Sequence, residues 1–395
     1  MKRKSKEIIL GSISSLIALT VGYFGTVVVL TTLIDRRPPA QPVITPVVKQ
    51  ESTLRFAAMG DMLAHDSVVT NAVVDGGYDF TPYFTNIRTL YNDADVVFCN
   101  PETPAAGNVL PISGYPSFNA PAEFTRDLTK VGCNMINLAT NHMYDKGETG
   151  VDATLTNWHA QKPLAIAGAY RNDSDSKNIA YFTKNGITVA FVAYRDFSNA
   201  KVPNEYAVPS YHNEALVTSQ LTEARQKADA VIVSAHWGTE DSTIVNDDQK
   251  KAAELFSRLG ADVVIGTGPH VVQAVESIAR DKDHDTTVWY SIGNMLSSQL
   301  QVNQLTGIIA KFTLTKQSTG VVVSRLEANP TFMTYEWSMA DRAAERLSTR
   351  KNLMLYPLRD AGDRLKTMFP GETIESRQQF LTSSLGSESD IQFVP

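Results

Sequence analysis

The chain has 395 residues, of which 43% are hydrophobic and 9% aromatic, a balance typical of a globular protein with a substantial core rather than of a disordered one. This length favours one large α/β domain with appended segments. The net charge of −6 is unevenly distributed, since residues 1–37 carry +4 and the remainder carries −10. Such an acidic domain disfavours nonspecific nucleic-acid binding, and we expect no nucleic-acid partner.

The amino-terminal segment predicts a membrane anchor. Four basic residues lie within residues 1–7, and an uncharged stretch follows over residues 8–34, long enough as a helix to cross a bilayer core of about 30 Å. A cleavable signal peptide is the alternative, but its apolar region usually spans only about 7 to 15 residues and ends at a small-x-small site, which VVLTTLIDRRPP lacks. The basic residues predict a cytoplasmic tail over 1–7, so the rest of the chain is expected to face outward from the cell membrane.

A proline-rich linker is predicted over residues 35–52, because the segment 36–50 contains four prolines and favours an extended backbone. The main domain is expected over 53–329. Beyond it, residues 330–395 are polar and predict a mostly helical extension, with an amphipathic helix from Met339 to Phe369.

Within the main domain, apolar runs of strand length alternate with stretches that have helical spacing, which predicts an α/β sheet. Strands are expected near 54–59, 95–99, 135–139, 164–168, 187–194, 230–235, 262–265 and 288–292, and helices near 122–132, 151–161, 213–228 and 247–260. Two successive strands over 307–316 and 320–328 then predict a hairpin that closes or extends a second sheet.

The two cysteines, Cys99 and Cys133, are expected to remain separate buried thiols. An outward location would permit a disulfide. However, Cys99 ends its predicted strand and Cys133 begins the next, which places them roughly 20 Å apart in a parallel pair.

Five of the apolar runs end at groups that can hold a metal ion or move a proton. In an open α/β sheet the ligand crevice lies beyond the carboxyl ends of the strands, and buried unpaired polar groups of this kind cost several kcal/mol. We therefore expect the five endings to converge. They are Asp61, the pair Asn100 and Glu102, the pair Asn141 and His142, His236, and His270.

The segment ATNHMYDKGETG carries the strongest local signal. Asn141 offers an amide oxygen suited to a hard cation, and the adjacent His142 points to a different side, where it can act as a general acid. Asp145 is placed to orient His142 and to raise its proton affinity. The structural alternative is that Asn141 and Asp145 only cap the following helix.

Further residues near these endings are predicted to contact substrate or to support the ligands. Each has an ordinary structural alternative, such as a turn residue or a solvated loop side chain. They are His65, Asn100, Trp237, Glu240, Gln273 and Asn294. His159, His212 and His284 have no comparable setting and are expected at the surface.

The motifs GDMLAHD, NPE, NLATNHMYDKGETG, SAHWGTE, IGTGPHVVQAVE and YSIGNM, in this order, resemble the CapA/PgsA family of poly-gamma-glutamate capsule synthesis proteins. The resemblance covers roughly residues 54–295. It implies a calcineurin-like metallophosphoesterase fold, a sandwich of two β-sheets flanked by helices. It also implies partners in a membrane complex, namely other capsule-synthesis subunits and an anionic glutamate polymer.

The resemblance also implies residue roles. Asp61 would bind the first of two divalent ions, Glu102 would bridge them, and His142 would be the general acid. Asn141, His236 and His270 would complete the ligand set. The wider superfamily usually has histidines where Leu63 and Gly268 stand in this chain, which puts one metal position in doubt. The oxygen-rich set suits manganese, magnesium or iron.

Three functional alternatives follow from these observations. The protein is a metal-dependent hydrolase or transferase acting at an anionic centre, as two bound cations would permit. Alternatively, it is a non-enzymatic scaffold subunit whose metal pocket binds polymer or a partner. The third alternative is an extracellular metallophosphoesterase unrelated to capsule, such as a nucleotidase released after signal cleavage.

Overall fold

A computed structural model describes residues 52–282, 284–386 and 391–394 of the chain. The predicted tail, the predicted anchor over 8–34 and nearly all of the predicted linker lie outside these residues. Within the described part of the chain, none of the helices combines the length and the apolar character needed to cross a bilayer.

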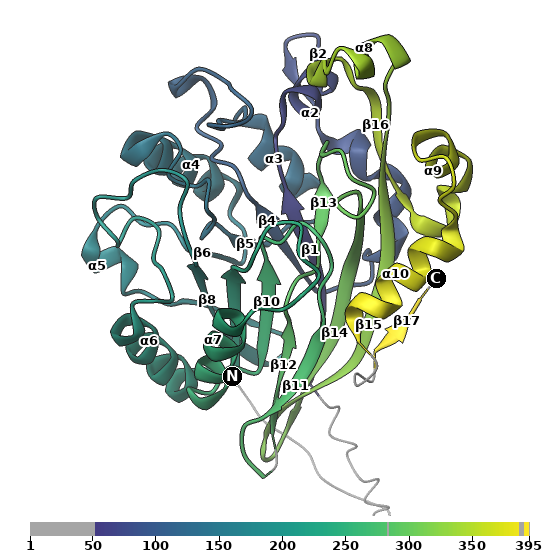
Figure 1. The fold of residues 1–395 in the computed structure, drawn as a ribbon. Coiled ribbons are helices and arrows are strands. Elements are labelled where there is room, and N and C mark those ends of the chain that lie inside the picture. Colours follow the sequence, from purple (N-terminus) through teal and green to yellow (C-terminus); the bar gives the residue numbers. More distant parts are fainter. Residues whose placement is uncertain (1–51, 283, 387–390, 395) are drawn as a thin grey trace, which may run out of the picture. The chain divides into compact units, whose positions relative to one another are not determined.

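Two β-sheets form the centre of the domain, and helices lie outside them (Figure 1). The larger sheet has the order β16 (Lys351–Pro357), β15 (Gly320–Glu336), β14 (Thr306–Gln317), β1 (Ser52–Met62), β4 (Val96–Pro101), β5 (Met135–Asn137) and β6 (Ala165–Ala167), with β13 (Asn294–Leu296) on β1 and β17 (Gln392–Phe393) on β15. The smaller sheet has the order β11 (Val275–Ala279), β12 (Asp285–Trp289), β10 (Val263–Thr267), β9 (Ala230–His236), β8 (Ile187–Arg195) and β7 (Ala180–Lys184). A short hairpin, β2 (Val73–Val74) and β3 (Gly77–Tyr78), lies apart from both.

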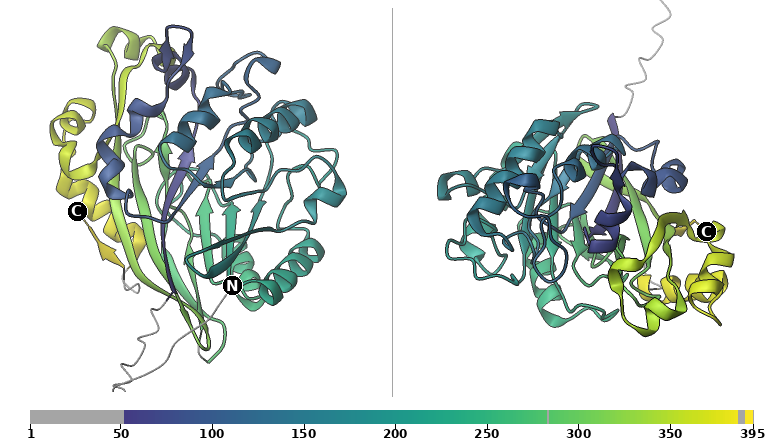
Figure 2. Two further views of the ribbon diagram at one scale, coloured as in Figure 1. Left: turned by 180° about the vertical axis from the view of Figure 1, so that it is seen from behind. Right: turned by 90° about the horizontal axis from the view of Figure 1, so that it is seen from above.

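The helices lie on the outer sides of the two sheets (Figures 1 and 2). The α-helices are α2 (Asp66–Asn71), α3 (Glu123–Lys130), α4 (Gly147–Gln161), α5 (Asp173–Ser176), α6 (Glu214–Lys227), α7 (Asp247–Arg258), α8 (Met339–Ala343), α9 (Gly362–Met368) and α10 (Ile374–Leu385). The 3-10 helices are η1 (Thr81–Leu90), η2 (Gly107–Val109), η3 (Leu347–Thr349) and η4 (Leu358–Asp360). This mixed α/β arrangement of flanked sheets agrees with the fold class predicted for a metallophosphoesterase-like domain.

Strand β8 shows why the sheets pack as two layers. Its alternate residues Val189, Phe191 and Ala193 lie in the main core together with residues of the larger sheet, and the Phe191 ring contacts Phe98 of β4 edge to face. The intervening residues, such as Val192, belong to a second apolar cluster shared with α6 and α7. A strand buried on both faces reads as an uninterrupted apolar run, which is how β8 and β9 appear in the sequence.

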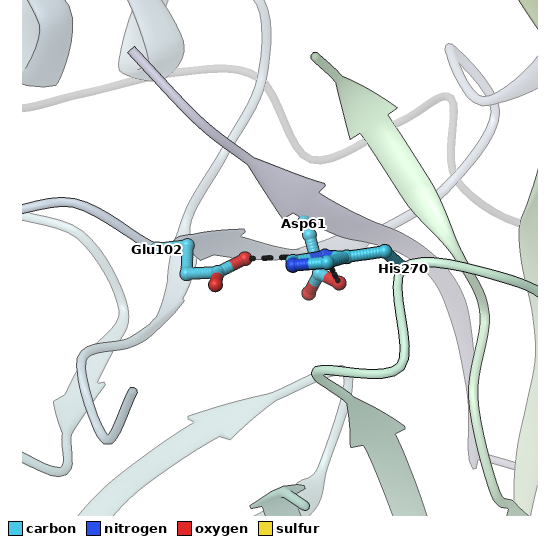
Figure 3. Close-up of side chains that lie close together, drawn as sticks. All are labelled: Asp61, Glu102 and His270. Carbon is cyan, nitrogen blue, oxygen red and sulfur yellow. Dashed lines mark hydrogen bonds and ion pairs between the residues drawn. The ribbon is translucent and has the colours of Figure 1, made fainter. Parts of the chain in front are cut away.

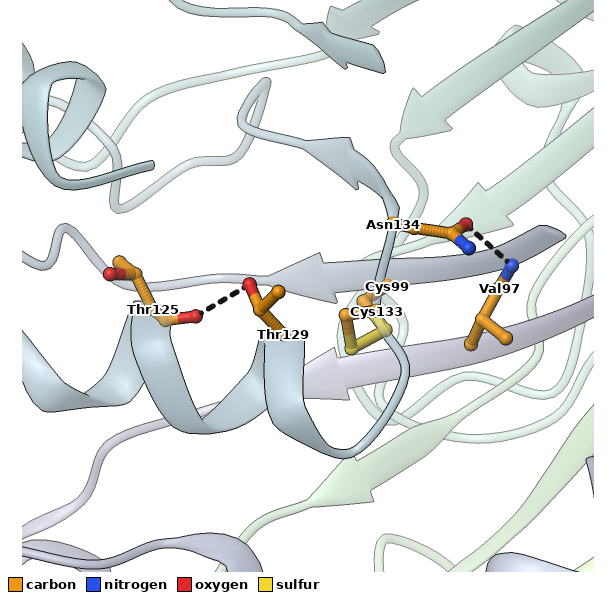
Figure 4. The surroundings of a disulfide bond; sticks show 6 residues. All are labelled: Val97, Cys99, Thr125, Thr129, Cys133 and Asn134. Atoms are coloured by element: carbon orange, nitrogen blue, oxygen red, sulfur yellow. Dashed lines mark hydrogen bonds between the residues drawn. A yellow bond between two sulfur atoms is a disulfide. The ribbon is translucent and has the colours of Figure 1, made fainter. Parts of the chain in front are cut away.

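The structure corrects the prediction for the cysteines, because Cys99 and Cys133 form a disulfide with Cα atoms 5.7 Å apart (Figure 4). Cys133 does not begin β5 but lies in the turn between α3 and β5. Strand β4 also continues beyond Cys99, and the register pairs Cys99 with Ile136. The two residues are therefore offset by about three positions rather than six or seven, and the turn brings the sulfurs together.

Three further expectations for the last third of the chain differ from the structure. The hairpin of β14 and β15 extends the sheet that contains β1, through the pairing of β14 with β1. The segment from Met339 to Phe369 is not one amphipathic helix, because it contains β16 between the short helices α8 and α9. Leu353 and Leu355 of β16 are buried at a spacing of two residues, as in a strand. The expected boundary at residue 330 falls inside β15.

Candidate metal centre

The carboxyl ends of parallel strands from both sheets bring the predicted residues together. Asp61 of β1 is paired with Asn100 of β4 and with Asn294 of β13. In the smaller sheet, His236 at the end of β9 is paired with Thr267 at the end of β10. The strand ends of the two sheets meet here, because Asn100 Nδ2 lies 3.5 Å from His236 Nδ1.

Asp61, Glu102 and His270 form a cluster at these strand ends (Figure 3). His270 Nδ1 lies 3.0 Å from Asp61 Oδ2 and 3.7 Å from Glu102 Oε2. All three residues are almost completely buried. Three buried ligand atoms within 4.8 Å of one another are a geometry that a metal ion can occupy.

Asn141 and His236 lie on the other side of Glu102. His236 Nε2 is 2.9 Å from Asn141 Oδ1 and 3.7 Å from Glu102 Oε1. The second nitrogen of His236, Nδ1, is 3.0 Å from Thr267 Oγ1, a contact that orients the ring. Glu102 therefore stands between two imidazoles, with one carboxylate oxygen toward each.

Both carboxylate oxygens of Glu102 are buried and have no hydrogen-bond partner among the described residues. Burial raises the pKa of the Glu102 carboxyl well above its usual range, and the Asp61 carboxylate adds to the rise. An orphaned buried carboxylate is costly, and a divalent cation is the partner that would satisfy it. Carboxylate, amide and imidazole donors fit manganese, magnesium or iron.

The charges in the centre depend on the two histidines. Burial lowers the pKa of His236 to about 3, so its ring is neutral. For His270 the opposing attraction of the Glu102 and Asp61 carboxylates exceeds the effect of burial and raises the pKa to about 10. Burial alone would raise the pKa of Asp61, but the hydrogen bonds from His270 and Asn100 and the charge of His270 together outweigh burial and lower it. In the metal-free protein, the imidazolium of His270 therefore balances the Asp61 carboxylate.

The local backbone is built to hold these side chains close together. His270 has a φ of 62°, a left-handed conformation that costs energy for a residue other than glycine and is concentrated at functional sites. A Cβ on Gly60 would lie 1.8 Å from the carbonyl oxygen of Gly293. Only glycine permits this approach, which lets Asp61 N donate to that carbonyl at 3.1 Å.

His142 and Asp145 form a pair beside the candidate metal ligands. His142 Nδ1 lies 2.8 Å from Asp145 Oδ2, and the same carboxylate oxygen accepts a hydrogen bond from Phe118 N at 2.8 Å. The Phe118 ring contacts His142 edge to face. With Nδ1 held by Asp145, the Nε2 atom is the one that remains for exchange with a reactant. Asn199 Nδ2 lies 3.1 Å from it.

A cavity of about 550 Å³ opens above this pair. Its lining includes His65, His142, Asp145, Glu240 and His270 among the predicted residues, and also Leu63, Tyr115, Pro116, Ser117, Phe118, Asn199, Ala200 and Gln299. The residues that sequence reasoning missed lie on loops that follow no buried strand pattern. The exception is Asn137, which ends β5 and whose Nδ2 donates to Asn100 Oδ1 at 2.6 Å.

The remaining predicted residues fall into two groups. Asn100 Nδ2 donates to Asp61 Oδ1 at 2.6 Å, and Asn294 Oδ1 lies 3.1 Å from His270 Nδ1, so both support ligand candidates directly. By contrast, Trp237 packs between Phe256 and Tyr290 in the second apolar cluster and does not line the cavity.

Gln273 also lies away from the cavity lining. It holds a loop, since its Nε2 donates to the carbonyl of Ser242 at 2.8 Å. His65 does line the cavity, and burial together with the Arg350 charge lowers its pKa to about 3. A neutral imidazole in the wall offers a substrate both a donor and an acceptor atom.

Comparison with known proteins identifies the family. Residues 55–299 match the family model described as bacterial capsule synthesis protein PGA_cap. The chain belongs to the PGA_cap family. The match begins in β1 and ends at Gln299, so it includes every residue of the candidate metal centre and the His142 and Asp145 pair.

Relatives of this PGA_cap member include two curated Bacillus proteins. The chain is 28% identical over 295 residues to the PGA biosynthesis protein CapA of Bacillus subtilis strain 168, covering 72% of this chain and 74% of that protein. It is 24% identical over 318 residues to the capsule biosynthesis protein CapA of Bacillus anthracis, covering 78% and 74%. Among solved structures, TT1561 of Thermus thermophilus aligns at 10% identity with a TM-score of 0.37, covering 69% of this chain and 98% of that one.

Proposed function

We propose that this PGA_cap protein is a membrane-anchored, outward-facing component of poly-gamma-glutamate capsule synthesis or export, with a divalent-metal centre for hydrolysis or transfer at an anionic group. The single observation that carries the metal centre is the Glu102 carboxylate, which is buried between two histidines and has no hydrogen-bond donor in the part of the chain that the structure describes. The proposed partners are the membrane, other capsule-synthesis subunits and the anionic polymer.

Two ions at this centre would polarise a phosphoryl or acyl oxygen and supply an activated water. Asp61, Glu102 and His270 would hold one ion, and Asn141 and His236 would join Glu102 at the other. His142 would move the proton. With Nδ1 bonded to Asp145, its Nε2 can protonate a leaving oxygen in the cavity.

The disulfide between Cys99 and Cys133 supports the outward location. Disulfides form and persist in oxidising compartments and are rare in the cytosol. Their presence here agrees with the orientation that the basic residues at positions 2–6 favour.

The test is metal binding and turnover by the purified full-length protein. We expect it to bind Mn²⁺, and to cleave an aryl phosphodiester or a glutamyl polymer in a metal-dependent way. His142→Ala should lower that rate by roughly 100-fold or more, the usual scale for loss of a general acid. His159→Ala is the control, because His159 lies exposed near the end of α4.

A scaffold role is the second proposal, and Leu63 and Gly268 favour it because they replace two histidines typical of the wider superfamily. It predicts metal binding without turnover on either substrate, and normal capsule formation by a His142→Ala strain. A protein that fails to bind Mn²⁺ at all would contradict both proposals.

A further inference from the structure

We propose that Asp196, His212 and Asp248 form a second divalent-cation site that takes zinc, separate from the candidate metal centre. One ligand atom from each of the three residues lies within 4.8 Å of the others. The residues come from three segments that meet at the edge of the smaller sheet: the loop after β8, the loop before α6, and the first turn of α7. The inference does not depend on the proposed function.

The three side chains are held in position by contacts with buried groups. Tyr211 is buried, and its hydroxyl donates to Asp248 Oδ2 at 2.6 Å. The Tyr211 ring packs against His212 with centroids 4.5 Å apart. The backbone of Asp196 is fixed as well, because its N–H donates to the carbonyl of His236 at 2.8 Å. Ligands that are already placed lose less conformational entropy when an ion binds.

The charges of the cluster favour a cation. His212 Nε2 lies 2.9 Å from Asp196 Oδ1 and 3.9 Å from Asp248 Oδ2. Two carboxylates therefore share a single imidazole, which carries at most one positive charge. A divalent ion placed among the three donors would neutralise both carboxylates.

The donor types select the ion. One imidazole and two carboxylates suit zinc, which takes nitrogen and oxygen ligands in a four-coordinate arrangement, whereas magnesium and calcium prefer oxygen ligands alone. His212 and Asp248 are about half exposed, so water can fill the remaining position. An ion here would link two loops to the first turn of α7, and the loop that carries Asp196 is hydrogen-bonded to His236.

The experiment titrates Zn²⁺ into the full-length protein by calorimetry and counts the zinc retained after desalting. We expect His212→Ala to bind one zinc equivalent fewer than the wild-type protein and to show a smaller zinc-induced rise in Tm. Asp61→Asn, which alters the candidate metal centre, should keep the equivalent that depends on His212. His159→Ala, an exposed histidine outside the cluster, should bind as the wild type does.

Equal zinc stoichiometry in the wild type and in His212→Ala would overturn the proposal. So would a His212-dependent equivalent that fills only at millimolar zinc, which would indicate an adventitious ion only. If His212→Ala does not fold, Asp248→Asn replaces it, because that change removes one ligand charge at an exposed position and should cost the same equivalent.

Discussion

Glu102 illustrates how one residue can be unfavourable for the fold and necessary for a site. It is fully buried, and its carboxylate oxygens lack hydrogen-bond donors among the described residues. Burial raises the pKa of this carboxyl, and an amide of nearly the same shape avoids the cost of desolvating a buried charge. Replacing the Glu102 carboxylate also removes the pair of charged oxygens that would bridge two ions.

Glu102→Gln is therefore expected to have opposite effects in the two states of the protein. The metal-free variant should have a Tm equal to or above that of the wild type, and the rise in Tm on adding Mn²⁺ should be largely lost. Calorimetry with EDTA and with Mn²⁺ measures both. Glu148→Gln, an exposed control, should change stability by less than about 0.5 kcal/mol. A metal-free Glu102→Gln protein that is several degrees less stable would contradict this account.

Asp127 is also a buried carboxylate but, unlike Glu102, it has hydrogen-bond donors and positively charged partners. It lies 2.7 Å from Arg126 Nε and 3.1 Å from Lys130 Nζ, and its Oδ2 accepts from Phe80 N at 3.0 Å. Burial alone would raise the pKa of Asp127, but the hydrogen bonds from Arg126, Phe80 and Lys130 outweigh burial and lower it. The unfolded chain therefore binds this proton more readily than the folded protein does.

Asp127→Asn is expected to lower the free energy of unfolding by about 1 to 3 kcal/mol at pH 7. Because the folded pKa lies below the unfolded value of about 3.9, the contribution of Asp127 is complete above that value and is lost as the pH falls through the folded pKa. The wild type and the variant should converge in urea unfolding as the pH drops below about 4. Asp152→Asn, which removes an exposed ion pair with Arg171, should cost less than about 1 kcal/mol. If the difference in the free energy of unfolding between the wild type and Asp127→Asn does not change with pH, then the shape of the side chain, not its charge, is responsible.

Among the elements, β4, α3 and β5 show what the sequence could and could not predict. Their existence and their parallel order follow from apolar runs that alternate with helical spacing. The polar endings Asp61, Asn100 and His236 could be placed at one edge, because parallel strands share a direction. Strand register is a different matter, since it depends on turn geometry. An error of three residues in the β4 and β5 register was enough to miss the disulfide.

The loop residues that line the cavity could not be predicted from the sequence for a related reason. Asn199, Tyr115 and Phe118 reach the cavity only because of how their loops fold back over the sheet edge, and no period in the sequence encodes that path. The alternation of apolar residues in β16 was a weak signal. It depends on Leu353 and Leu355 in a short segment that is otherwise typical of a helix.

The disulfide that joins β4 to the turn between α3 and β5 should contribute measurably to the free energy of unfolding. It closes a loop with a sequence separation of 34 residues, for which the chain-entropy model gives about 3 to 4 kcal/mol. The double variant Cys99→Ala, Cys133→Ala should lose about that much free energy of unfolding in urea. Wild-type protein unfolded with a thiol reductant should approach the variant, while the variant should be indifferent to the reductant. A wild type equally stable with and without reductant would refute the assignment.

For the whole molecule, the segment after residue 329 is part of the sheet rather than an addition to it. Strand β15 passes through that point, and β16 pairs with β15 and covers η1, where Asn86 Nδ2 donates to the Leu355 carbonyl at 3.2 Å. The main core includes Phe332 and Leu355 from this segment together with Phe84 and Ile87 of η1.

A chain that ends at residue 329 is therefore expected to be insoluble or to unfold without a cooperative transition, because it exposes this part of the core. A chain that ends at residue 386 loses, among the described residues, the pairing of β17 with β15, the hydrogen bond from Val394 N to the Ala328 carbonyl and the packing of Ile391 and Phe393 at the rim of the core. It keeps the core residues of β15 and β16 and should unfold cooperatively. Circular dichroism melts of both chains measure the difference. Cooperative unfolding of the shorter chain would mean that the core closes without β16.

Strand β1 also fixes how the domain can be handled in the laboratory. It begins at Ser52 and carries Asp61 near its other end, so roughly 30 Å of extended backbone separates the two at 3.3 Å per residue. A tag or a surface linkage joined ahead of Ser52 would therefore be attached at the end of β1 opposite to the candidate metal centre. The centre would stay accessible to ligands in solution. Attachment at that terminus is the orientation to choose for surface plasmon resonance.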